Sequence, residues 1–218
     1  YYKSMNDLKN LFISFINKVP SFGKSFICID DKNNEALLKK IKIKNYHTYG
    51  TNLKSQFHIK NIKLTKEYSE YDLAIKLPGK KNITINKIKI PLLGLHNIRN
   101  ATAAAAVAST IGIPKEIIKK GLKDFKGVQR RFNKIFTYRG ISFYDDYAHH
   151  PTEIKEVLNG IRATYKKDKI ICIFQPHRIS RLKDLKKEFA ISFRKADIVI
   201  LCPVYTAGEK IKLGFSYS

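Results

Sequence analysis

Apolar positions near the start of the chain change from the period of a helix to that of buried strands. One helix face collects the apolar side chains of Leu8, Leu11, Phe12, Phe15 and Ile16. That spacing predicts an amphipathic helix over residues 4–18. A turn at Pro20–Gly23 leads into an apolar run that predicts a strand over 25–29. A helix near 33–40 and a strand near 45–49 follow, an order typical of an α/β domain.

Residues 56–90 change to a period of two. Alternation in Tyr71–Leu77, broken at Pro78, predicts antiparallel strands joined by turns. The alanine-rich run Ala101–Ala108 then predicts a closely packed helix, because alanine is the best helix former. A further helix is expected to begin at Pro114, since proline is well placed in a first helical turn.

The loop Lys126–Phe132 separates these elements from a second series. Strands are predicted near 134–138, 141–145, 169–174 and 197–202, with helices over 151–165 and 181–195. Strands separated by helices of this length form right-handed crossovers and a mainly parallel sheet. We therefore predict an α/β fold with two domains, residues 1–126 and 127–218. The end of the chain, Gly214–Ser218, adds no closing element, so the second domain is expected to be incomplete.

Composition is that of a globular protein, with 44% hydrophobic and 28% charged residues, and no apolar stretch reaches the roughly 20 residues of a membrane span. The net charge of +24 raises the possibility of nucleic-acid binding. Lysine, however, is scattered over every segment and greatly outnumbers arginine, which indicates a compositional bias. A basic nucleic-acid-binding module is the non-enzymatic alternative, and retention on heparin at high salt without nucleotide binding would favour it.

The cysteines Cys28, Cys172 and Cys202 each lie in or beside an apolar run. An odd number without paired spacing gives neither a disulfide framework nor a zinc motif. Buried, reduced thiols of a cytoplasmic protein are the prediction.

The segment Tyr144–Glu153 carries two carboxylates and two imidazoles where a predicted strand ends and Pro151 opens a helix. Carboxylates there can accept hydrogen bonds from sugar hydroxyls, and imidazoles can carry a proton. Adjacent residues of an extended chain point apart, which disfavours a metal site, and no metal ligand is predicted. The alternative to a functional loop is a helix cap provided by Thr152 or Asp146.

A second segment, Gln175–Arg181, also follows a strand and precedes a helix. Its arginines flank His177, so guanidinium groups and free helix N–H groups could form an anion pocket. The alternative is a solvated basic turn.

Two weaker signals complete the set. Asn97 and Asn100 lie three residues apart on the opening turn of a predicted helix, so their amides are expected on one side, where they could match the edge of adenine. Asn97 alone would be a simple helix cap. The pair Arg130-Arg131 lies in the loop between the predicted domains, where a cation could reach a phosphate.

In their order along the chain, these motifs resemble the Mur ligases. The matching segments are Gly94–Ala101, Gly127–Phe132, Asp145–Glu153, Phe174–Arg181 and Val204–Glu209. The resemblance implies an ATP-dependent ligase of peptidoglycan precursor synthesis, whose middle ATP-binding domain precedes a Rossmann-like C-terminal domain. Among the family, the segments look like those of the members that join L-alanine to UDP-N-acetylmuramate.

By this resemblance, Asn97 and Asn100 would contact adenine, Arg131 the ATP phosphates and Asp146 the ribose. The residues that would face the amino-acid and muramoyl substrates are His150, His177, Arg178 and Arg181. Catalytic roles fall to Arg131, His150 and His177. ATP would phosphorylate the lactyl carboxylate, and the amine of L-alanine would attack the acyl phosphate.

The phosphate loop, the Mg²⁺ ligands and the UDP-sugar domain of the family are expected upstream of Tyr1, so these 218 residues alone are expected to be inactive. A murein-peptide-recycling ligase of the same family is the alternative enzyme. It shares the His-His-Pro loop, but its later segment resembles Glu-Pro-Arg-Ser-Asn-Thr rather than Gln175–Arg178.

Overall fold

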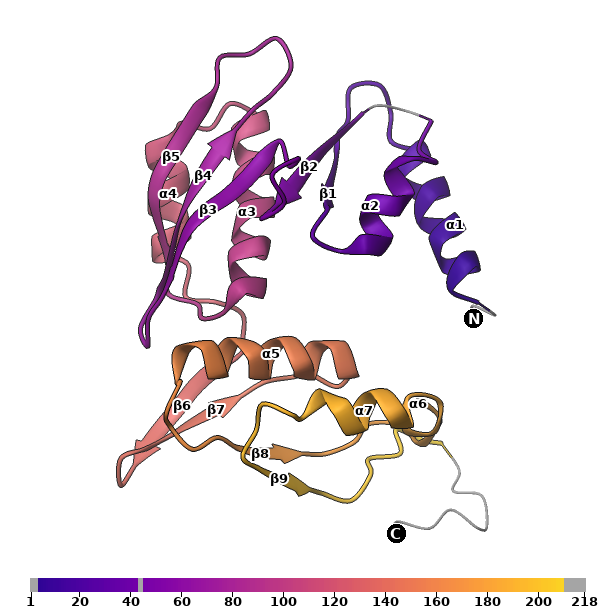
Figure 1. Cartoon of the computed structure of the whole chain (residues 1–218), viewed down its shortest axis with the longest axis vertical. Coiled ribbons are helices and arrows are strands. Elements are labelled where there is room, and N and C mark those ends of the chain that lie inside the picture. Colours follow the sequence, from indigo (N-terminus) through magenta and orange to yellow (C-terminus); the bar gives the residue numbers. More distant parts are fainter. Residues whose placement is uncertain (1–3, 43–44, 210–218) are drawn as a thin grey trace. The chain divides into compact units, whose positions relative to one another are not determined.

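The computed structural model describes residues 4–42 and 45–209, which fall into two compact units (Figure 1). The first unit comprises most of the chain up to Phe125. The second begins at Lys126 and also includes the short segments Leu64–Lys66 and Leu92–His96. The fold is mixed α/β, as the sequence predicted. The predicted open end at Gly214–Ser218 lies outside the described residues.

The first unit is built on a five-stranded sheet with the strand order β1-β2-β3-β4-β5. Its elements are α1 (Met5–Asn17), β1 (Ser25–Cys28), α2 (Lys32–Leu38), β2 (Tyr46–Gly50), β3 (Phe57–Leu64), β4 (Ser69–Ile75), β5 (Ile83–Ile90), α3 (Leu95–Thr110) and α4 (Lys115–Asp124). Strands β1, β2 and β3 pair in parallel, and β4 pairs with β5 antiparallel. The expected antiparallel pairing is thus confirmed for β4 and β5, and β3 lies between β4 and the parallel strand β2.

The alanine-rich helix α3 supplies much of the core of this unit. Ala105 and Ala106 are almost completely buried, as are Phe57 and Leu73 of the sheet. Small side chains allow a helix to approach its neighbours closely, which explains the alanine run. Helices α3 and α4 lie beside the β3–β5 part of the sheet (Figure 1).

Asp30, directly after β1, fixes the relation of the parallel strands to α3. One carboxylate oxygen accepts the N–H groups of Thr51 (2.8 Å) and Asn52 (3.0 Å) just after β2. The other accepts Nε of Arg99 on α3 at 2.7 Å, in an ion pair whose Asp30 side chain is only 7% exposed. Gly50 leaves room for this carboxylate, because a Cβ there would lie 2.4 Å from Asp30 Oδ1.

The second unit contains two small sheets. Its elements are β6 (Asn133–Tyr138), β7 (Ile141–Asp145), α5 (Pro151–Thr164), β8 (Ile171–Phe174), α6 (Ile179–Asp184), α7 (Lys186–Ser192) and β9 (Ile198–Leu201). Strands β6 and β7 form an antiparallel hairpin, and β8 pairs with β9 in parallel.

The single helix predicted over 181–195 is wrong. The structure has two short helices, α6 and α7, with Leu185 between them at φ −117° and ψ 26°. No proline or glycine marks this break. Leu182 and Leu185 pack with Phe189 against the same core, so tertiary packing decides the path of the chain here.

Helices α5 and α7 cover one side of the second unit's strands (Figure 1). The core of this unit lies between the helices and the strands and is formed by Ile154, Leu158, Ile170, Phe174 and Phe189. The register aligns Ile171 with Ile198 and Ile173 with Ile200, and all four side chains are exposed. These strands have the apolar composition of strands that are covered on both faces.

Asp30→Ala is expected to lower the free energy of unfolding by about 3 kcal/mol, because it removes a nearly buried carboxylate that accepts two N–H groups and pairs with Arg99. Denaturant unfolding of the purified protein measures this. The matched control is Lys54→Ala, which removes an exposed 3.8 Å ion pair with Glu35 and is expected to cost less than about 0.5 kcal/mol. Equal losses in the two variants would contradict the role of Asp30.

Candidate functional site

The loops after β7 and β8 meet in the second unit. The rings of His149 and His177 lie 6.1 Å apart, centroid to centroid. The ring of Tyr147 lies 5.3 Å from His149, and that of Tyr205 lies 5.2 Å from His177. Segments singled out separately in the sequence therefore form one row of aromatic and imidazole rings.

Asp146 connects two loops by hydrogen bonds. One is the arginine loop, residues 130–132, and the other is the histidine loop, residues 146–150. Its carboxylate accepts the N–H of Ala148 at 2.7 Å and the N–H of Phe132 at 2.8 Å, one on each oxygen. The N–H of Tyr147 donates in turn to the carbonyl of Arg130 at 2.8 Å. Burial raises the pKa of Asp146 even though both N–H groups favour the charged form. Each oxygen keeps a further acceptor site, so the carboxylate can still bind a ligand hydroxyl.

The arginine loop is held in an unusual backbone conformation. Arg130 and Phe132 have positive φ angles of 57° and 52°. Nε of Arg130 lies 3.2 Å from Asp145, with its guanidinium over the ring of Tyr147. The Phe132 ring stacks on Tyr144 at 4.4 Å. The side chain of Arg131, between these two anchored residues, is exposed.

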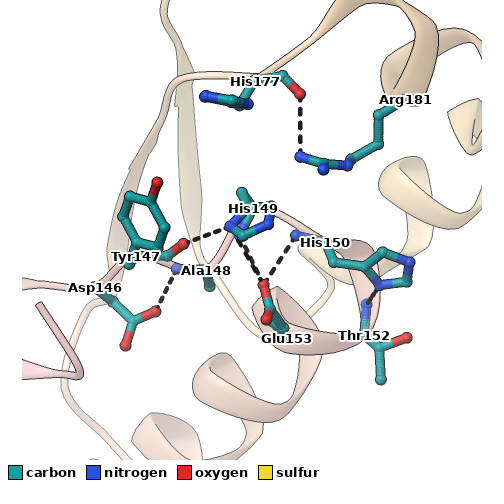
Figure 2. Close-up of polar contacts among 9 residues, drawn as sticks. All are labelled: Asp146, Tyr147, Ala148, His149, His150, Thr152, Glu153, His177 and Arg181. Atoms are coloured by element: carbon teal, nitrogen blue, oxygen red, sulfur yellow. Dashed lines mark hydrogen bonds and ion pairs between the residues drawn. The ribbon is translucent and has the colours of Figure 1, made fainter. Parts of the chain in front are cut away.

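The sequence left a helix cap by Thr152 or Asp146 as the alternative for this segment, and neither residue caps the helix that begins at Pro151. His150 is the N-cap residue, and its Nδ1 accepts the N–H of Thr152 at 3.3 Å. Glu153 completes the capping box by accepting the N–H groups of His149 and His150 (Figure 2). The cap uses one nitrogen of His150 and leaves Nε2 for other partners.

The turn that precedes α6 carries His177 and Arg178, and Arg181 lies on that helix. Partial burial and the charge of Arg181 lower the pKa of His177, so its ring is neutral at neutral pH. The guanidinium of Arg181 points back to the carbonyl of His177 at 3.3 Å (Figure 2). Arg178 is exposed. The turn therefore presents a neutral imidazole beside two cations, which is suited to an anionic ligand.

Asn97 and Asn100 lie on the first turns of α3, as predicted. Their surroundings differ, because Asn97 is only 9% exposed while Asn100 is exposed. The three-residue spacing of the two asparagines predicted that their amides share one side of the helix. It did not predict that Asn97 is nearly buried while Asn100 is exposed.

Three residues of the second unit's site received no role from the sequence. They are Glu153, Tyr205 and Glu209, which hold the loops described above. Glu153 carried a detectable signal, an acidic residue at the third position of a helix after a capping residue. Tyr205 and Glu209 act through contacts between segments far apart in the chain, which no local pattern shows.

No group of three or more His, Cys, Asp or Glu side chains in the described ranges is arranged to hold a metal ion. Residues 4–42 and 45–209 also contain no helix with the length and apolar character needed to cross a bilayer. The cysteines are unpaired and half-buried rather than fully buried, and burial raises the pKa of the Cys28 and Cys172 thiols.

These two compact units, the second with basic and imidazole loops after its strands, place the chain in the α/β class. The family profile of the Mur ligase middle domain matches residues 1–108, and that of the Mur ligase glutamate ligase domain matches residues 130–214. The chain therefore belongs to the Mur ligases.

Individual proteins that are similar to the chain also carry the names of Mur ligases. The chain is 78% identical over all 218 residues to a UDP-N-acetylmuramate–L-alanine ligase of Pelagibacter ubique, covering 47% of that protein. It is 40% identical over 217 residues, 99% of its length, to the ligase of the same name from Chelativorans sp., covering 46% of it. The crystal structure of UDP-N-acetylmuramate–alanine ligase from Thermotoga maritima matches 94% of the chain and 43% of that protein, with a TM-score of 0.69 and 25% identity. The chain thus spans about half the length of the curated relatives it matches.

Glu153→Gln is expected to cost about 1 kcal/mol of stability at pH 7, since the capping box loses a charged acceptor. Although partial burial opposes it, the N–H groups of His149 and His150 and the His149 ring lower the pKa of Glu153. Its contribution is therefore full above the usual value of 4.5 and is lost as the pH falls through the lower folded value. Denaturant unfolding at pH 7 and below pH 4 measures this, with the exposed Glu188→Gln as control. A difference between wild type and Glu153→Gln that stays constant with pH would contradict it.

Proposed function

We propose that the protein containing this chain is a cytoplasmic, ATP-dependent ligase that joins L-alanine to UDP-N-acetylmuramate in peptidoglycan precursor synthesis. One observation carries the proposal: the loops with Arg131, Asp146 and His177 meet in a chain 78% identical to a ligase of that name. Residues 1–126 would be the later part of its ATP-binding domain and residues 127–218 its C-terminal domain.

The nucleotide roles come from the resemblance to the Mur ligases, and the chemistry of the side chains suits them. Asn97 and Asn100 would contact the adenine edge through amide donors and acceptors. Asp146 would accept a ribose hydroxyl on the lone pairs that its two N–H partners leave unused. The exposed guanidinium of Arg131 would reach the ATP phosphates, where cations stabilise the charge that develops during phosphoryl transfer.

The reaction would have two steps. The lactyl carboxylate of UDP-N-acetylmuramate attacks the γ-phosphorus of ATP, which forms an acyl phosphate and releases ADP. The amine of L-alanine then attacks the acyl carbon, the C–O bond to phosphate breaks, and phosphate leaves. The ammonium group of alanine must lose a proton before this attack. A neutral imidazole can accept it, and the lowered pKa of His177 supports that role.

His150, Arg178 and Arg181 would bind the amino-acid and muramoyl groups. Mg²⁺ would accompany the ATP, and no residue of this chain is assigned to it. The rival murein-peptide-recycling ligase finds less support, because the turn after β8 reads Gln175-Pro176-His177-Arg178.

Purified full-length protein is expected to release ADP and phosphate only when ATP, UDP-N-acetylmuramate and L-alanine are all present. Product analysis by mass spectrometry checks that alanine has been added to the sugar nucleotide. Turnover with a murein peptide in place of L-alanine, and none with L-alanine, would favour the recycling ligase.

Arg131→Ala in the full-length protein is expected to lower kcat by about 10²–10³-fold, because a cation at the phosphates is lost. The fold should be intact, since the exposed side chain makes no hydrogen bond or ion pair with the described residues. Steady-state kinetics and a thermal melt measure the two effects. Arg139→Ala, at the exposed β6–β7 turn, is the matched control and should leave kcat unchanged. Unchanged turnover in Arg131→Ala would remove this residue from the site.

A further inference from the structure

The segment Cys202–Glu209 continues the pairing of β8 and β9 beyond the ends of both strands. The N–H of Cys202 donates to the carbonyl of Phe174, and the N–H of Tyr205 donates to the carbonyl of Pro176, both at 2.8 Å. The N–H of Arg178 donates back to the carbonyl of Tyr205, also at 2.8 Å. The turn that carries His177 and Arg178 is therefore attached along its length to a segment about thirty residues later.

Arg178 has a backbone conformation that residues other than glycine rarely adopt, with φ 72° and ψ 128°. Such a conformation is unfavourable and persists only where surrounding contacts hold it. It also determines where the guanidinium points, because the side chain leaves the turn from this residue. The contacts on either side of Arg178 thus control the position of its charge.

Glu209 provides the contact on the far side. Its carboxylate accepts the N–H of Ser180 at 3.0 Å and the Ser180 hydroxyl at 2.6 Å, one on each oxygen. These two bonds and the bond from Arg178 N–H to Tyr205 enclose the strained residue from both sides. The bonds from Ser180 lower the pKa of Glu209, so the carboxylate is charged at neutral pH. An amide in its place would offer a single acceptor oxygen.

We propose that Glu209 is a positioning residue, which holds the turn in its strained conformation so that Arg178 is presented to an anionic group of the substrate. This rests on the proposed function for the identity of that group. The hydrogen bonds of Glu209 to Ser180 and of Arg178 to Tyr205, here called the clamp, lie within the second unit alone. Glu209 need not touch the substrate, because it acts through Ser180 and Arg178.

A double-mutant cycle in the full-length protein tests the role. Glu209→Ala is expected to lower kcat/KM for UDP-N-acetylmuramate by about tenfold, the scale of one charge-assisted hydrogen bond. In an Arg178→Ala background the same change should alter kcat/KM by less than about twofold, because the side chain that it positions is already gone. Equal losses in both backgrounds would show a purely structural role and overturn the proposal.

Hydrogen exchange in the same proteins tests the clamp without reference to activity. The Ser180 amide should exchange faster in Glu209→Ala than in wild type, and unchanged exchange would overturn the proposal. Glu188→Ala, an exposed carboxylate on α7, should change neither exchange nor kinetics. If wild type fails to ligate L-alanine, the proposed function fails, and exchange alone decides whether Glu209 holds the turn.

If Glu209→Ala does not fold, Ser180→Ala replaces it in the cycle. This change removes only the bond from the hydroxyl and keeps the backbone donor. A loss of kcat/KM that disappears in the Arg178→Ala background supports the proposal. A loss that persists there, or no loss at all, overturns it.

Discussion

The carboxylate of Asp146 is the contact on which the candidate site of the second unit depends. It bonds to N–H groups of two segments, Phe132 and Ala148, and so fixes the arginine loop against the loop that opens α5. Hydrogen bonds to a partly buried charge are strong, and an unpaired partner there is costly. Two residues with positive φ, Arg130 and Phe132, persist within this arrangement. The carboxylate acts together with the ion pair of Arg130 and the ring stacking of Phe132, which hold the same two residues.

The same device recurs elsewhere in the chain. Asp30 after β1 and Glu209 after β9 also accept N–H groups from segments distant in sequence. Each of these carboxylates accepts at least two donors, and so joins segments that lie far apart in the chain. The sheets position the loops roughly, and these carboxylates fix them.

Some elements could be predicted because apolar spacing follows from burial on one face, as in α5, where Ile154 and Leu158 are buried. The apolar spacing of α1 also predicted its helix, although none of its side chains is buried in the structure. The break at Leu185 could not be predicted, since its cause is packing against a core formed by other segments. Nor could the cap at His150, because histidine is an uncommon capping residue. The sequence identified Asp146 and His177 as candidates but not the bonds that unite their loops, which join residues far apart in the chain.

Sequence alone also could not separate the members of the two arginine pairs. In each pair the structure commits one guanidinium to the fold: Arg130 to Asp145 and Tyr147, and Arg181 to the carbonyl of His177. The other members, Arg131 and Arg178, are exposed, and their guanidinium groups make no hydrogen bond or ion pair with other described residues. Arg130 attracts a second anion weakly, because the carboxylate of Asp145 compensates its charge. The division within each pair therefore makes Arg131 and Arg178 the cations best placed to bind an anionic ligand. Arg130 keeps its loop in place, and Arg181 holds the carbonyl of His177 while its charge still adds to the turn.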